Sequence, residues 1–115
     1  MIHAAHASRH HWAAVGTAAN LARGEWQCSR VYAVLGRGEP ALWHARRCVA
    51  ILEANGIRGW DIAGAYEAMA RASAVAGNST EARAWATRAQ AACDAIEEDE
   101  DRRIIQADIA TLPLD

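Results

Sequence analysis

The sequence predicts an all-α fold, and three observations support that class. Alanine fills 29 of the 115 positions, while phenylalanine is absent. Alanine has the highest helix propensity and is depleted in strands. Small and apolar residues recur at steps of three and four, which places them on one face of a helix. Glycines separate these periodic stretches, and a chain of this length supports a single domain with one core.

The periodic stretches and the residues between them define the expected helices in order. Gly36 ends one helix, and Pro40 begins the next within its first turn. Gly77 ends a later helix, and Asn78 with Glu81 three residues on resembles a capping box. Short turns between them make consecutive helices antiparallel neighbours. We expect helices over residues 3–14, 18–35, 40–54, 61–76, 80–96 and 100–111.

An internal repeat relates two parts of this pattern at one fixed offset, the separation of Gly36 from Gly77. Leu35-Gly36 aligns with Ala76-Gly77, and small or apolar residues follow both glycines at matching positions. Such a fixed period is typical of arrays built from one repeated unit. The matching positions are Ala41, Ala45, Cys48 and Leu52 in the first unit, and Ala82, Ala86, Ala89 and Cys93 in the second.

The spacing of a glycine, an alanine five residues later and small residues four and seven beyond that resembles the second helix of a tetratricopeptide repeat. Seven residues before each glycine, Ser29 and Ala70 match the small residue of that family's first helix. The unit departs from the family in its length of 41 residues rather than about 34. It also lacks the terminal proline, and Ala45 and Ala86 replace the usual aromatic residue. The resemblance covers about residues 21–96 and implies a right-handed superhelical array of five or six antiparallel helices.

On this resemblance, the single domain of residues 1–115 divides into four parts. Residues 18–55 and 60–97 are full units, and residues 99–112 form a capping helix. Residues 1–15 align with the second half of a unit and are expected to form a half-repeat helix. Because a half-repeat leaves one hairpin face exposed, we expect a homo-oligomer through this N-terminal helix.

In tetratricopeptide arrays the first helices line a concave groove that binds a protein or peptide partner. Two guanidiniums beside an indole in such a groove suit an acidic or carboxylate-bearing segment. The alternative is purely local, with a cation–π contact and an i,i+4 ion pair worth about 0.3–1 kcal/mol each. By distance from each glycine, the groove positions include Gly64 and the candidate binding residues Arg23, Trp26, Arg30, Glu67 and Arg71.

The N-terminal histidines suggest an alternative function. Four of the five histidines lie within nine residues, and His3, His6 and His10 share one face of the expected helix. Neutral imidazole is the commonest metal ligand, so this face predicts a metal- or small-ligand-binding helical protein. No carboxylate lies between these histidines, and a solvated helix face is the other interpretation. A self-association module is a further alternative.

Composition excludes several classes of function. All 12 basic residues are arginine, which excludes lysine catalysis, and a net charge of −2 provides no basic field for nucleic acid. Cys28, Cys48 and Cys93 have no CxxC spacing and are expected to be free thiols. No apolar run approaches the ~18 residues that a membrane span needs. We expect a cytoplasmic, non-enzymatic protein without a cofactor, which binds neither nucleic acid nor membrane.

Nucleophilic catalysis has one weak candidate pair in the sequence. His44 precedes Cys48 by four residues, a spacing that brings two side chains together on a helix. Cys48 also holds a small-residue core position of the repeat, which favours packing over reactivity. We therefore predict no catalytic residue.

Overall fold

The computed structural model describes the backbone of residues 2–114 and the side chains of residues 14–114. This part of the chain contains helices and no strands, so the predicted all-α class is confirmed. The last four helices begin and end within two residues of the expected positions. The five helices are α1 (Ile2–Val34), α2 (Gly38–Ala54), α3 (Trp60–Val75), α4 (Ser79–Asp94) and α5 (Asp99–Ala110).

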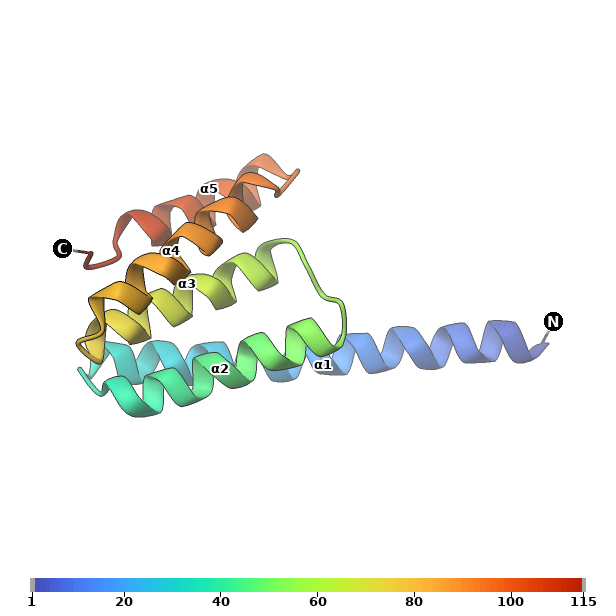
Figure 1. Ribbon diagram of the computed structural model, residues 1–115. Helices are drawn as coiled ribbons and strands as arrows, with labels where there is room; N and C mark the ends of the chain where they lie inside the picture. The colour runs from blue at the N-terminus through green and yellow to red at the C-terminus, as the bar shows by residue number, and fades with distance from the viewer. Residues whose placement is uncertain (1, 115) are drawn as a thin grey trace.

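The helices form two antiparallel hairpins and a final helix that packs on the second hairpin (Figure 1). Helices α1 and α2 make the first hairpin, and α3 and α4 make the second. Helix α3 lies at the centre, because it packs against each of the other four helices. A helix contacted on all sides needs small side chains to let its neighbours approach. Its buried alanines are Ala63, Ala65, Ala68, Ala70 and Ala72.

The N-terminal part of the chain corrects one prediction. Helices expected separately over residues 3–14 and 18–35 are a single helix of 33 residues, α1. Gly16 lies inside this helix, where it costs about 1 kcal/mol relative to alanine but does not force a break. The half-repeat helix predicted within residues 1–15 therefore continues into the next helix instead of folding back against it.

The two hairpin turns share one backbone geometry, at the two glycines that the repeat aligns. Gly36 and Gly77 adopt positive φ angles of 74° and 85°, which glycine reaches without steric cost. The Gly36 N–H donates to the Ala33 carbonyl, and the Arg37 N–H donates to the Tyr32 carbonyl. The corresponding donors of the second turn make the corresponding bonds. This pair of bonds is a Schellman motif, which ends α1 and α3 in the same way.

The residues that follow each turn confirm the predicted packing of the second helices. All eight small or apolar repeat positions of α2 and α4 are buried. The Asn78 side chain accepts a hydrogen bond from the Glu81 N–H at 3.1 Å, which is one half of the predicted capping box. In the first hairpin, the buried Ser29 hydroxyl donates to the Ala41 carbonyl at 2.8 Å and ties α1 to α2.

The start of α2 touches the end of α3 at a glycine. Gly38 is the first residue of α2. A Cβ atom built on Gly38 would lie 2.5 Å from the Cα of Ala76. The absence of a side chain at Gly38 therefore allows the two hairpins to meet backbone to backbone.

No helix in the described part of the chain combines the length and the apolar character required to cross a membrane.

Candidate functional site

A cavity of about 200 Å³ lies between α1, α3 and α5, and residues of α2 also line it. Within the described chain, α1 and α5 both pack against α3 but not against each other, so side chains alone bridge the space between them. The walls are mostly apolar, with aromatic and aliphatic groups from all four helices. The lining residues are Ala22, Arg23, Trp26, Gln27, Cys48, Leu52, Trp60, Asp61, Gly64, Ile104, Ile105 and Asp108.

Trp26 brings an unpaired donor to this cavity. Its indole nitrogen, Nε1, is buried and has no hydrogen-bond partner among the described residues. Most buried donors in folded proteins are paired, and an unpaired one costs about 1–3 kcal/mol. The indole of Trp26 therefore offers a hydrogen bond that the described side chains leave unused.

Gly64 keeps the space beside this donor open. A Cβ atom at Gly64 would lie 3.8 Å from Nε1 of Trp26 and 3.7 Å from Cδ1 of Ile105, both ordinary van der Waals contacts. Alanine would thus fit at this position in the middle of α3, where glycine is unfavourable by about 0.5–1 kcal/mol. Glycine at position 64 therefore leaves open a space that an alanine side chain could fill without disturbing α3.

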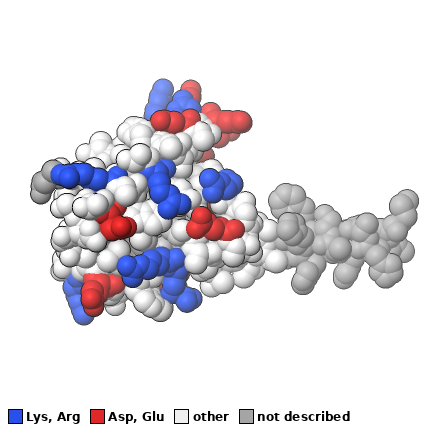
Figure 2. Space-filling view, in the orientation of Figure 1, with Lys and Arg blue, Asp and Glu red and all other residues white. Residues whose placement is uncertain are grey.

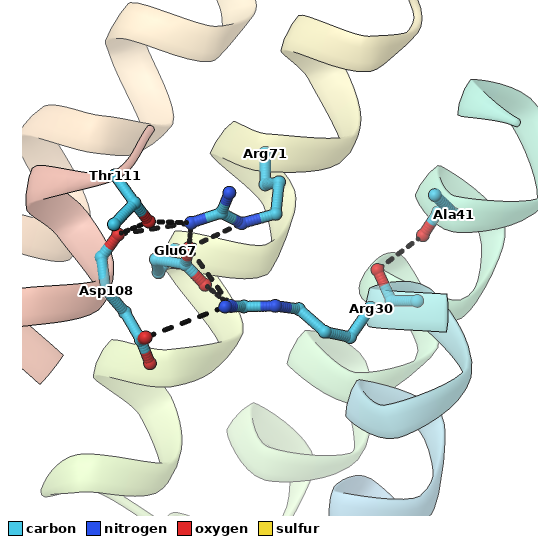
Figure 3. A network of polar contacts seen from close by, with 7 residues as sticks. Arg30, Ala41, Glu67, Arg71, Asp108 and Thr111 are labelled. Atoms are coloured by element: carbon cyan, nitrogen blue, oxygen red, sulfur yellow. Dashed lines mark hydrogen bonds and ion pairs between the residues drawn. The ribbon is translucent and has the colours of Figure 1, made fainter. Parts of the chain in front are cut away.

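Next to the cavity, a buried carboxylate joins α3 to α1 (Figure 3). Glu67 has only 1% of its side chain exposed. Its Oε1 accepts hydrogen bonds from Nε and Nη2 of Arg71 at 2.9 and 2.6 Å. Nη1 of Arg30 lies 3.3 and 3.4 Å from the two carboxylate oxygens. One carboxylate from α3 therefore binds guanidinium groups from both α1 and α3.

The same two arginines reach α5. Nη2 of Arg71 donates to the Asp108 carbonyl at 3.1 Å and to the Thr111 hydroxyl at 2.7 Å. Nη2 of Arg30 lies 3.6 Å from Oδ1 of Asp108. Arg30 also stacks over the Trp26 ring, with 5.6 Å between the guanidinium carbon and the ring centroid. These contacts hold α5 against α3 and fix the far wall of the cavity.

Burial raises the pKa of Glu67 above its ordinary value, although Arg71 and Arg30 oppose the shift. A carboxyl group whose pKa is raised by folding stabilises the fold most below the unfolded pKa, and this contribution falls as the pH rises through the folded pKa. The advantage of the wild type over Glu67→Gln should therefore shrink from pH 4 to pH 8. Urea unfolding of both proteins across this range measures it, and an advantage that grows with pH would contradict the expectation.

The mouth of the cavity carries a second ion pair. Nε and Nη2 of Arg23 each donate to a carboxylate oxygen of Asp61 at 3.0 Å, a bidentate pair between α1 and α3. The guanidinium carbon of Arg23 lies 5.0 Å from the centroid of the Trp60 ring. Arg23 and Trp60 therefore form one edge of the opening.

The five candidate binding residues predicted from the sequence lie together along the facing sides of α1 and α3. Arg23 and Trp26 line the cavity, whereas Arg30, Glu67 and Arg71 form the adjoining network. Both local contacts considered for the sequence are present, the Trp26–Arg30 stacking and the Glu67–Arg71 ion pair. Sequence reasoning did not identify five other residues of the site: Trp60, Asp61, Ile104, Ile105 and Asp108.

His44 and Cys48, the weak nucleophilic pair, have different surroundings. His44 Nδ1 lies 2.7 Å from a carboxylate oxygen of Glu25, outside the cavity. Burial of Glu25 alone would raise its pKa, but hydrogen bonds from His44 and Arg47 outweigh it and lower that pKa. Burial raises the pKa of the Cys48 thiol to about 12. Cys48 therefore stays protonated at neutral pH and is a poor nucleophile.

The side chains of His3, His6 and His10, the predicted metal ligands, lie outside the described residues. Among the side chains that are described, no group of three or more His, Cys, Asp or Glu residues is placed to hold a metal ion.

Charge on the visible face is mixed. Arginine and acidic side chains lie next to one another over this face in Figure 2. Interspersed charges create no extended field of one sign over this face.

No protein-family model, curated protein or solved structure matches this chain.

Proposed function

We propose that the protein is a non-catalytic binding module that receives an apolar side chain of a protein or peptide partner in the cavity between α1, α3 and α5. The observation that carries this proposal is the combination of an apolar cavity with the unpaired indole N–H of Trp26. An apolar pocket with a few well-placed polar groups is the usual form of a binding site.

The size of the cavity favours a side chain over a whole ligand. Its volume of about 200 Å³ is below the ~300–1,000 Å³ of pockets that enclose drug-sized molecules. One aliphatic or aromatic side chain gains most of its transfer free energy by filling such a space, about 1.5–3 kcal/mol. A peptide would lie over the opening and insert one residue.

The polar groups of the site determine what can accompany that side chain. The Trp26 N–H lacks an acceptor among the described residues, but it is shielded from solvent, so a partner's backbone carbonyl would bind it only after the neighbouring side chains move. In contrast, Arg30 and Arg71 already contact Glu67 and α5. A partner carboxylate would have to compete with these internal oxygens, so the apolar anchor has stronger support than recognition of an acidic segment.

The chemistry of the lining supports a non-catalytic role. Cys48 is protonated, and both aspartates that line the cavity are near arginines, Asp61 with Arg23 and Asp108 with Arg30. Nucleophilic catalysis needs an activated nucleophile with a base beside it. The described lining residues offer neither.

We also propose that the two hairpins are units of a tetratricopeptide-like array. The matching bonds of the turns at Gly36 and Gly77 support a common unit, as do the buried small residues of α2 and α4. In such arrays the first helix of each unit forms the binding surface, and α1, α3 and α5 occupy that position around the cavity.

A random peptide library selected against the protein tests the proposed function, with Gly64→Leu as the matched blocked variant. Selected peptides should share one apolar position, and Gly64→Leu should weaken their binding about tenfold or more. In ¹⁵N NMR spectra, the indole N–H signal of Trp26 should shift on binding. Peptides that bind Gly64→Leu equally well, or that share only acidic positions, would refute the cavity as the binding site.

Gly64→Ala separates stability from binding. We expect the free energy of unfolding to rise by about 0.5–1 kcal/mol, because alanine is the better helix former and its Cβ meets only ordinary contacts. The added methyl group enters the cavity, so affinity for the selected peptides should fall. Thermal unfolding and peptide titration measure the two effects, and lower stability would show that the neighbours of Gly64 cannot accommodate a Cβ.

A further inference from the structure

One acceptor at the cavity receives no hydrogen bond from the described residues. Asp108 lines the cavity from α5, and 32% of its side chain is exposed. Among the described residues its carboxylate makes one ion pair, with Nη2 of Arg30 lying 3.6 Å from Oδ1 (Figure 3). That distance is too long for a hydrogen bond. The carboxylate of Asp108 can therefore accept a donor from a molecule that enters the cavity.

Filling the cavity changes the surroundings of this carboxylate. A side chain that enters shields part of Asp108 from water, and a charged group that loses water without gaining a hydrogen bond is destabilised. A purely aliphatic or benzyl side chain has no donor to offer in exchange. The site therefore favours an anchor with an apolar body, which meets the walls, and a donor at its far end.

The charges around the cavity favour a neutral donor. Each arginine of the site and its network faces an acid, so three positive charges accompany three negative charges. A lysine or arginine anchor would add a positive charge without a counterion, and an unpaired charge taken out of water is costly. The six charged residues are Arg23, Arg30, Arg71, Asp61, Glu67 and Asp108.

The indole of Trp26 narrows the choice to a hydroxyl group. Arg30 stacks on the Trp26 ring and pairs with Asp108, so the indole and the carboxylate lie beside the same guanidinium. A hydroxyl both donates and accepts, whereas an indole or backbone N–H only donates. One hydroxyl oxygen can thus donate to Asp108 and, after the side chains that shield Nε1 move, accept from Trp26.

We propose that the anchor is a tyrosine, whose ring fills the apolar part of the cavity and whose hydroxyl donates to the carboxylate of Asp108. This inference rests on the proposed function, because it names the side chain that the same cavity receives. Tyrosine joins a large apolar ring to a hydroxyl that donates and accepts. Serine and threonine carry a hydroxyl without a ring and would leave the walls at Leu52 and Ile105 uncovered.

Small probes test the chemistry of the cavity without a partner. p-Cresol reproduces the tyrosine side chain, toluene lacks its hydroxyl, and p-methylanisole keeps the oxygen but has no proton to donate. Apolar protein cavities of about 150 Å³ bind benzene, so probes of this size are suitable. In NMR titrations that follow the indole signal of Trp26, we expect p-cresol to bind about tenfold more tightly than either of the other two.

Two substitutions on α5 test the role of the carboxylate. Asp108→Ala should remove the preference for p-cresol, so that the three probes bind with similar affinity. The Asp108 carbonyl and the Thr111 hydroxyl still bind Arg71 in this variant, and an unchanged circular dichroism spectrum checks that α5 stays helical. Glu100→Ala removes the same charge at an exposed position of α5 and should leave the preference unchanged.

Peptides test whether the phenol belongs to a partner chain. The position shared by the selected peptides should be tyrosine, and its change to phenylalanine should weaken binding to the wild type about tenfold. The same change should have little effect on binding to Asp108→Ala. A protein that binds p-cresol but selects no tyrosine peptide would assign the cavity to a free phenol and overturn the tyrosine anchor.

The outcomes separate this inference from the proposed function. Equal affinity of the wild type for p-cresol and toluene, with binding of both blocked by Gly64→Leu, would overturn the tyrosine anchor and keep the cavity as the binding site. A preference for p-cresol that survives Asp108→Ala would overturn the role of the carboxylate. Absence of binding by all three probes and by tyrosine peptides, or binding that Gly64→Leu does not weaken, would overturn both proposals.

Discussion

Glu67→Ala is expected to lower the free energy of unfolding by about 3–5 kcal/mol, since removing one member of a buried ion pair leaves its partner charges uncompensated. The side chains of Arg71 and Arg30 are only 15% and 30% exposed and lie within hydrogen-bond distance of this carboxylate. Typical domains are stable by about 5–15 kcal/mol, so the loss is a large part of the total. Urea unfolding followed by circular dichroism measures it.

A triple substitution in the same network tests whether uncompensated charge causes this loss of stability. Changing Glu67, Arg30 and Arg71 together to apolar residues of similar size removes all three charges, and should recover much of the stability that Glu67→Ala loses. Glu53→Ala, at an exposed position of α2, should change stability by less than about 0.5 kcal/mol. A loss under about 1 kcal/mol for Glu67→Ala would show that the carboxylate does not hold the two guanidiniums.

Gly38→Ala is expected to cost about 1–3 kcal/mol, the usual penalty for overpacking. The new Cβ would lie 2.5 Å from the Cα and 2.7 Å from the Cβ of Ala76. Backbone atoms cannot move aside as a flexible side chain can, so the two hairpins would have to separate where they meet. Differential scanning calorimetry should show a lower melting temperature.

Gly16→Ala is the matched control for this change. Gly16 also lies in a helix, but a Cβ atom there would meet no atom within 4 Å. The substitution should raise stability by about 0.5–1 kcal/mol through helix propensity alone. Equal stability of Gly38→Ala and wild type would disprove the close contact between Gly38 and the backbone of Ala76.

The hairpins could be predicted from the sequence because their signals are local. Gly36 and Gly77 each end a helix because glycine readily adopts a positive φ angle. The Asn78 side chain caps the next helix by accepting a hydrogen bond from the N–H of Glu81, three residues later. The repeat positions of α2 and α4 were predicted for a related reason, since a helix that packs closely on one side needs small side chains there. The all-α class and most helix boundaries follow from such short-range patterns.

The junction within α1 and the partners of the arginines could not be predicted in this way. Gly16 lowers helix propensity by only about 1 kcal/mol relative to alanine, which is not enough to end the helix. Arg23 bonds to Asp61, 38 residues away on α3. Arg71 bonds to Asp108 and Thr111, 37 and 40 residues away at the end of the chain, and Arg30 also pairs with Asp108. Which acid meets which arginine depends on the rotation and tilt of packed helices, and no sequence spacing specifies these.

The buried thiols of Cys48 and Cys93 give access to motions of the fold. Burial raises the pKa of both thiols, and only a deprotonated, exposed thiol reacts quickly with a labelling reagent. Cys48 lies beneath the cavity between the hairpins, and the Cys93 thiol donates to the Arg102 carbonyl of α5 at 3.4 Å. Labelling of Cys48 therefore reports separation of the hairpins, whereas labelling of Cys93 reports release of α5. Their two rates distinguish opening of one part of the molecule from unfolding of the whole.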